Sequence, residues 1–198
     1  MRDIRVLSGP ASVLIRDGKI AYAGPSADCP TMESGVERVD AKGHSVLPGL
    51  VDSHTHLVFG GFREDEFQWR LAGESYMSIM EKGGGIAATT TATREASAEE
   101  LTEAALLHLR SMLRMGVTTM EAKSGYGLDK ETELRQLEVA KRLDEMQPID
   151  VISTYLGAHD IAPEYQGDPD GYIDFIIREM LPLVKERGLA RNVDIFTE

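Results

Sequence analysis

Two histidines separated by a single residue are the side chains of this sequence best arranged to bind a metal ion. His54 and His56 end the apolar segment GLVDSHTH at residues 49–56. In a β-strand, residues i and i+2 point to the same face, so both imidazoles can approach one ion at about 2.0–2.1 Å. A His-X-His pair is often only exposed or structural, but a pair that closes an apolar strand favours a metal site.

Three other side chains suited to binding or catalysis also follow apolar segments. The planar guanidinium of Arg63 suits a carboxylate, although a surface arginine beside an acidic residue is commonplace. The phenol of Tyr126 lies between two glycines, whose flexible backbone could bring it close to a ligand or let it pack as part of a turn. His159 precedes Asp160, which could orient it, but a lone histidine at a strand end is more often a core or surface residue.

The spacing of these side chains fits a fold that alternates β-strands with α-helices. From about residue 45, apolar segments alternate with amphipathic ones, which is typical of a parallel α/β sheet or barrel. The active site of such a barrel lies at the carboxyl ends of the strands, so Arg63, Tyr126 and His159 are expected to converge. The expected strands are Val46–Ser53, Thr118–Lys123, Val151–Leu156 and Val193–Thr197.

Residues that cap or break helices delimit three further elements. The helices are expected over 97–116, 129–148 and 168–188, and they begin with a capping box, an aspartate N-cap and an Asp-Pro pair, respectively. Pro182 should kink the third helix. The run Gly83–Gly85 lacks the lysine and hydroxyl of a phosphate-binding loop and is expected to permit a mobile active-site loop.

Residues 1–46 form a separate group of short predicted strands. Segments 13–15 and 19–22 flank an Asp-Gly pair, which is a strong β-hairpin signal, and another strand is expected at Glu37–Asp40. So few strands cannot form a stable core alone, so this segment should pack on something else. The predicted domains are therefore residues 1–46 and residues 47–198.

Four blocks spread over about a hundred residues carry a family resemblance in addition to the histidine motif. The motif GLVDSHTH is similar to the first-strand metal motif of the amidohydrolase superfamily. The blocks FGGFREDEF at 59–67, KGGGI at 82–86, EAKSGYGL at 121–128 and LGAH at 156–159 resemble the imidazolonepropionases in order and approximate spacing. The chain is thus identified as similar to the N-terminal half of an imidazolonepropionase.

The resemblance implies a fold and a reaction. The fold would be the first half of a metal-dependent (β/α)8 TIM barrel, preceded by part of a small β-sandwich domain. The reaction would be hydrolysis of 4-imidazolone-5-propanoate to N-formimidoyl-L-glutamate in histidine degradation, with one divalent metal ion, zinc or iron. His54 and His56 would bind the metal. Arg63, Tyr126 and Tyr76 would bind the substrate, and His159 would bind it and act in catalysis.

The same resemblance implies that the site is incomplete within these residues. The family's remaining metal ligands come from later strands, so the isolated chain is expected to be truncated, inactive and weak in metal binding. The fourth expected strand reaches Glu198, which would face the site with no assigned role. An open half-barrel would also expose sheet edges to partners, and a homodimer is compatible with this.

Composition excludes several other classes of protein. The net charge of −12 gives no basic surface for nucleic acid. The single cysteine excludes an intramolecular disulfide framework and a cysteine-based zinc site. The first twenty residues lack the apolar run of a signal peptide, and no segment has the roughly twenty apolar residues that a membrane span requires. A soluble, cytoplasmic protein is expected.

Two alternative functions remain open on sequence alone. Another amidohydrolase, such as a nucleobase deaminase or a dihydropyrimidinase-like enzyme, would share the histidine motif but recognise a different ring. A non-catalytic binding or assembly module is the alternative from a different class.

Glu121 and Lys123, which alternate on the second strand, are compatible with a purely structural role.

Overall fold

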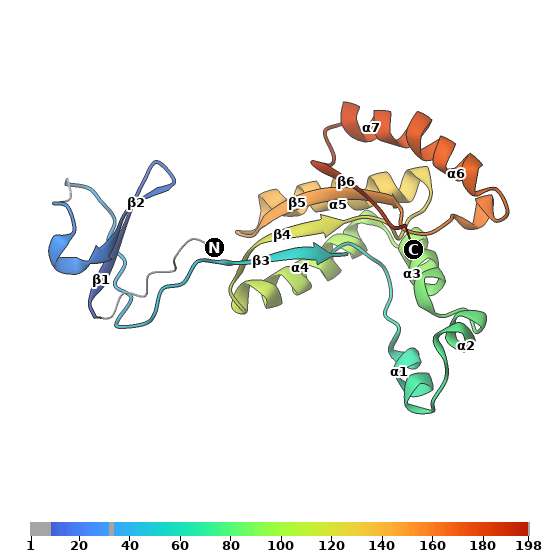
Figure 1. The fold of residues 1–198 in the computed structure, drawn as a ribbon, viewed down its shortest axis with the longest axis horizontal. Helices are drawn as coiled ribbons and strands as arrows, with labels where there is room; N and C mark the ends of the chain where they lie inside the picture. Colours follow the sequence, from blue (N-terminus) through green and yellow to red (C-terminus); the bar gives the residue numbers. More distant parts are fainter. Residues whose placement is uncertain (1–8, 32–33, 198) are drawn as a thin grey trace. The chain divides into compact units, whose positions relative to one another are not determined.

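The computed structural model describes residues 9–31 and 34–197 (Figure 1). The chain divides into two compact units, Met1–Pro48 and Gly49–Glu198, which are considered separately. The first contains a hairpin of β1 (Ala11–Arg16) and β2 (Lys19–Pro25), followed by a short 3-10 turn at Ser26–Asp28. The predicted hairpin is confirmed.

The hairpin closes at the predicted Asp-Gly pair. Asp17 and Gly18 both have positive φ angles, 52° and 69°, which is the conformation of a two-residue turn whose twist matches that of the flanking strands.

The strand predicted at Glu37–Asp40 is wrong. Residues 36–40 are irregular and exposed, and the charged side chains of this segment leave it no apolar face to bury against a neighbouring strand.

The second unit contains a parallel four-stranded sheet. Its strands are β3 (Leu50–Thr55), β4 (Val117–Lys123), β5 (Asp150–Ala158) and β6 (Asn192–Ile195), paired in chain order. All four predicted strands are present. The start predicted at Val46 is wrong, since Pro48 has no N–H for the ladder and also restricts the residue before it. The first strand instead extends through Thr55, toward the histidines.

The long helices begin where the sequence predicts. In α4 (Ala98–Arg114), Ser97 and Glu100 form the complete capping box, and in α5 (Lys130–Met146) the Asp129 side chain accepts from the Thr132 N–H at 2.7 Å. Leu101, Ala105 and Leu109 of α4 are buried, whereas Leu113 near its end is 39% exposed.

The third predicted helix is present but interrupted. It consists of α6 (Pro169–Phe175), a π-helical segment at Ile176–Met180 and α7 (Leu181–Glu186). The irregularity lies directly before Pro182, which has no N–H and whose ring crowds the carbonyl one turn earlier. The kink predicted at Pro182 therefore takes the form of a widened, π-helical turn just before the proline.

Three short helices fill the interval between β3 and β4. They are α1 (Glu64–Leu71), α2 (Tyr76–Glu81) and α3 (Gly85–Glu95), which extend away from the carboxyl end of the sheet in Figure 1. The loop predicted at Gly83–Gly85 is a tight turn that begins α3. It is closed by the Gly85 N–H, which donates to the buried carboxylate of Glu66 at 2.6 Å.

One face of the sheet packs on helices and the other carries polar side chains. Met120 and Ala122 of β4 lie in a core cluster with residues of α4 and α5. Because side chains alternate along a strand, Glu121 and Lys123 lie on the opposite face. The unit is thus a curled parallel sheet covered by helices on one side, consistent with part of a barrel. No helix in the described ranges is both long and apolar enough to cross a membrane.

Candidate functional site

The candidate residues lie where three neighbouring strands end. His56 follows β3, Tyr126 follows β4 and His159 follows β5, and parallel pairing brings these carboxyl ends to one edge of the sheet (Figure 1). The ring centroid of His56 lies 4.6 Å from that of Tyr126 and 4.6 Å from that of His159, which stacks on it. The His54 ring lies 6.1 Å from that of His56. The expected convergence of Tyr126 and His159 with the histidine pair is therefore present.

A local irregularity in β3 includes His54 and lies just before His56. The pairing register with β4 slips between Asp52 and Thr55, as in a β-bulge, which re-aims side chains near a strand end. Asp52 Oδ1 stabilises the irregular backbone by accepting from the Thr55 hydroxyl at 2.8 Å and from the His54 N–H at 3.2 Å. Simple strand alternation therefore does not by itself set the direction of His54.

His56 is a neutral imidazole with an unused nitrogen. The pKa of His56 is lowered to about 4, mainly by burial and also by the positive charges of the neighbouring His159 and His54. The backbone of Ser124 opposes this shift, yet Nδ1 of His56 is buried without a hydrogen-bond partner among the described residues. A neutral, desolvated imidazole nitrogen without a partner is what a metal ligand requires.

The loop that carries Tyr126 depends on two glycines. Gly125 has a φ of 109°, and a Cβ there would lie 2.7 Å from the Leu156 carbonyl oxygen and 2.9 Å from the His159 Cβ. A Cβ on Gly127 would lie 2.6 Å from the backbone nitrogen of Glu133. Both contacts are too short for any side chain, so only glycine lets this loop approach β5 and the start of α5 so closely.

His159 is oriented by the same loop. Its Nδ1 lies 3.0 Å from the carbonyl oxygen of Gly125. A carbonyl can only accept, so Nδ1 carries the proton and Nε2 is the nitrogen left for a ligand. Asp160, considered as an orienting partner from the sequence, instead accepts from the N–H of Ile161 at 2.8 Å.

Arg63 and Tyr76 lie close enough to Tyr126 to act on its ionisation. Burial raises the pKa of Tyr126, Arg63 lowers it by its positive charge, and Tyr76 raises it. Arg63 directly precedes α1, and its Nε lies 3.9 Å from Oε1 of Glu66. Tyr76 is the first residue of α2 and is 54% exposed. The structure thus brings all six sequence-predicted residues to one region.

A buried lysine network lies on the polar face beside these residues. Lys123 Nζ contacts Glu121 Oε1 at 2.9 Å and Asp194 Oδ2 at 2.8 Å, and the Thr154 hydroxyl donates to Glu121 at 2.6 Å. Hydrogen bonding to Lys123 is the main cause that lowers the pKa of Asp194, and the charge of His54 contributes. The network ties β4, β5 and β6 together and reaches the neighbourhood of His54.

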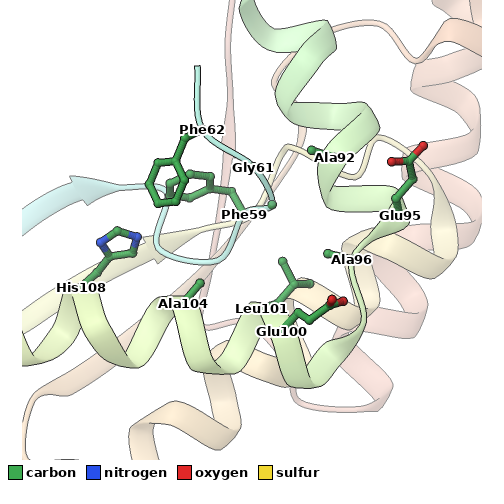
Figure 2. A pocket seen from close by; sticks show the side chains of 11 residues that line it. Phe59, Gly61, Phe62, Ala92, Glu95, Ala96, Glu100, Leu101, Ala104 and His108 are labelled. Carbon is green, nitrogen blue, oxygen red and sulfur yellow. The ribbon is translucent and has the colours of Figure 1, made fainter. Parts of the chain in front are cut away.

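A separate groove of about 360 Å³ opens between the segment after β3 and helices α3 and α4 (Figure 2). Phe59 and Phe62 line one side, where Phe59 stacks on His108 of α4 at 5.7 Å between ring centroids. None of the six candidate residues lines this groove, so it is not the site described above.

The described residues supply part of a metal site at most. Across residues 9–31 and 34–197, no group of three or more His, Cys, Asp or Glu side chains is arranged to hold a metal ion. Glu198, which the sequence predicts to face the site, lies outside the described residues.

Two residues that sequence analysis did not single out hold the Tyr126 loop. Glu133 Oε1 accepts from the N–H groups of Gly125, Gly127 and Leu128, and Arg94 Nε donates to the Gly127 carbonyl at 2.7 Å. The one sequence signal for Glu133 is its place on the buried stripe of α5 with Leu137 and Ala140. Arg94 lies in α3 with no local pattern that distinguishes it.

The whole chain is similar in sequence to one group of known proteins. No protein-family model matches it. All of it aligns with proteins named imidazolonepropionase: 60% identical over 199 residues in Porphyromonas gingivalis, 52% over 202 in Bacteroides thetaiotaomicron and 50% over 201 in Bacillus velezensis. These matches cover 47%, 48% and 46% of the relatives. The chain therefore spans about half the length of the curated relatives it matches.

Proposed function

Because this chain belongs with the imidazolonepropionases along its whole length, we propose that it supplies the substrate-binding part of an enzyme that hydrolyses 4-imidazolone-5-propanoate. The product would be N-formimidoyl-L-glutamate, in histidine degradation. The observation that carries the proposal is the convergence of His56, Tyr126 and His159 at the ends of three parallel strands, with ring centroids 4.6 to 5.2 Å apart.

His54 and His56 are the proposed ligands of one divalent ion, zinc or iron. The buried, neutral imidazole of His56, whose Nδ1 has no hydrogen-bond partner within residues 9–31 and 34–197, supports this assignment. When bound, such an ion lowers the pKa of a water molecule toward about 7 and polarises a carbonyl group. His and carboxylate ligands accept both metals, so the choice between them calls for metal analysis of protein purified without added ions.

The remaining roles follow from what each side chain can offer. Arg63 presents a planar set of donors for the propanoate carboxylate, and both Arg63 and Tyr76 act electrostatically on Tyr126. Tyr126 keeps its proton at neutral pH, since the ordinary pKa of a tyrosine is near 10 and burial raises it, so it can donate a hydrogen bond. His159 would contact the ring carbonyl through Nε2, which can donate to that carbonyl when the imidazole is doubly protonated, while Nδ1–H keeps its bond to Gly125.

The four-stranded parallel sheet is the proposed first half of a larger barrel. We take β3 to β6 as the first four strands of a (β/α)8 TIM barrel, supported by their parallel order and the helices that cover one face. The β1–β2 hairpin would belong to a small β-sandwich domain. A cytoplasmic location and a homodimer remain predictions.

Carboxylate-dependent ligand binding tests the proposed substrate class. Calorimetry on the chain would compare imidazole-4-propanoate, a stable analogue, with unsubstituted imidazole and with hydantoin. We expect the propanoate to tighten binding by about tenfold or more, as a charge-assisted hydrogen-bond pair with Arg63 would. Equal affinity for the three compounds would contradict the assignment and favour another amidohydrolase or a non-catalytic module.

Zinc titration tests the proposed ligands. Since the described residues offer no group of three suitable side chains, we expect the 198-residue chain to bind zinc weakly and to show no turnover. The double variant His54→Ala/His56→Ala is the control and should remove the residual binding. Submicromolar binding that persists in this control would show that other residues hold the ion.

A further inference from the structure

Glu133 is a buried acidic residue with an unusual set of partners. It belongs to α5, and only 1% of its surface is exposed. A single carboxyl oxygen, Oε1, accepts three backbone hydrogen bonds: from Gly125 at 3.1 Å, from Gly127 at 2.8 Å and from Leu128 at 3.0 Å. These three amides belong to the loop that carries Tyr126.

The carbonyl groups of the same loop are also held. Gly125 accepts from His159 at 3.0 Å, Gly127 from Arg94 at 2.7 Å and Leu128 from the Tyr172 hydroxyl at 3.2 Å. Leu128 itself has a φ of 58°, a conformation that costs a non-glycine residue energy and persists only when its surroundings impose it. Glu133 is the acceptor that satisfies the N–H groups on the inner side of this turn.

We propose that Glu133 is a positioning residue whose Oε1 atom fixes the Gly125–Leu128 loop, and thereby sets the placement of Tyr126 and the orientation of His159. The link to His159 is short, since Gly125 donates to Glu133 and accepts from the His159 ring. The functional consequence rests on the proposed role of Tyr126 and His159 in binding the substrate.

An acceptor oxygen, rather than a negative charge, is what this position requires. Oε2 of Glu133 is buried without a hydrogen-bond partner among the described residues. The Ser124 hydroxyl lies near this carboxyl, and it accepts from the N–H of Leu156 at 3.0 Å. Burial raises the pKa of the Glu133 carboxyl, and hydrogen bonding with the Ser124 side chain and with the backbone of the loop opposes this shift. A glutamine keeps an oxygen in the Oε1 position, so it should substitute for Glu133, whereas methionine should not.

The experiment compares E133Q, E133M and E133D with wild type in the 198-residue chain. Leu143→Ala is the matched control, because Leu143 is a fully buried residue of the same helix that packs in the core cluster with Met120 and Ala122 of β4. Amide hydrogen exchange at Gly125, Gly127 and Leu128 is the first readout. We expect these amides to exchange about tenfold faster or more in E133M and E133D, and near the wild-type rate in E133Q.

Two further readouts separate positioning from general stability. Nitrogen NMR shifts of the His159 ring report which nitrogen carries the proton, and they should change in E133M but not in E133Q or L143A. Affinity for imidazole-4-propanoate should fall in E133M and hold in E133Q. Should E133M fail to fold, E133D, which keeps the carboxyl but shortens its reach, provides the same comparison.

The outcomes distinguish this inference from the proposed function. Unchanged exchange in E133M and E133D, or an equal acceleration in L143A, overturns the positioning role. Faster exchange with unchanged ligand affinity also overturns it, since the loop would then not matter for the site. If wild type fails to bind imidazole-4-propanoate while the exchange and NMR changes occur as expected, the positioning role stands and the substrate assignment fails.

Discussion

The His159 ring donates a hydrogen bond from Nδ1 to the backbone carbonyl of Gly125, 3.0 Å away. This bond joins the end of β5 to the loop after β4, and it determines which ring nitrogen can meet a ligand. It also separates the two tasks of His159, because one nitrogen maintains the local structure and the other is available for chemistry.

Replacing His159 with asparagine should separate these two tasks. Asparagine can donate to the Gly125 carbonyl from the Nδ1 position but has no atom at the Nε2 position. We expect the unfolding free energy of the variant to stay within about 1 kcal/mol of wild type, while affinity for imidazole-4-propanoate falls about tenfold or more. Urea unfolding and calorimetry measure the two quantities. Unchanged affinity would rule out ligand contact by Nε2.

Replacing Gly125 with alanine should be more damaging than the same change at Gly167. Both glycines have positive φ angles, 109° and 92°, so both variants should lose about 1–3 kcal/mol through backbone strain. At Gly125 the new Cβ would also crowd Leu156 and His159, which should cost a further 1–3 kcal/mol or so. No atom of the described residues lies within 4 Å of a Cβ at Gly167. Equal losses in urea unfolding would contradict the close approach.

Replacing Arg63 with lysine should weaken carboxylate binding far more than zinc binding. Lysine keeps the positive charge but loses the planar pair of donors, so affinity for imidazole-4-propanoate should fall about tenfold. Zinc affinity should change by less than about twofold, because Arg63 is not a metal ligand. Both are measured by calorimetry on the same preparation. A parallel loss of zinc would show that Arg63 supports the histidines instead.

The stability of the protein should depend on pH through Glu133. Its folded-state pKa is raised, mainly by burial. The contribution of the protonated carboxyl is therefore complete below the unfolded-state pKa near 4.5 and is lost as pH rises through the folded-state value. E133Q cannot lose a proton, so the unfolding free energy of E133Q relative to wild type should increase as pH rises above about 4.5. A constant difference across that range would mean that Glu133 is ionised in the folded protein.

The sequence predicts the elements of this fold well where local signals agree. The capping box at Ser97, the Asp129 N-cap and the Asp-Gly turn each specify a backbone conformation within a few residues, and each is present. The strand predicted at Glu37–Asp40 fails because strand formation depends on a partner that the segment itself does not specify. The start predicted for β3 at Val46 fails because Pro48 has no N–H to donate to the strand ladder.

The residues of the candidate site also differ in whether local sequence predicts them. His56, Tyr126 and His159 follow strand ends, so the barrel rule is enough to predict that they meet. The β-bulge after Asp52 and the burial of His56 depend on pairing with β4, which the motif does not contain. Glu133 and Arg94 act through the backbone of a distant loop, and a hydrogen bond between segments that are far apart in sequence leaves no local pattern.

The most direct test of the central claim is turnover by a hybrid enzyme. The matched segment of the Porphyromonas gingivalis imidazolonepropionase would be replaced by residues 1–198 of this chain, and formation of N-formimidoyl-L-glutamate would be followed by mass spectrometry. We predict a kcat/KM for 4-imidazolone-5-propanoate at least about a hundredfold above that for hydantoin, dihydroorotate or guanine. The His54→Ala/His56→Ala version should lose this activity. A folded hybrid that is inactive, that is insensitive to loss of both histidines, or that opens the other rings equally fast would contradict the account.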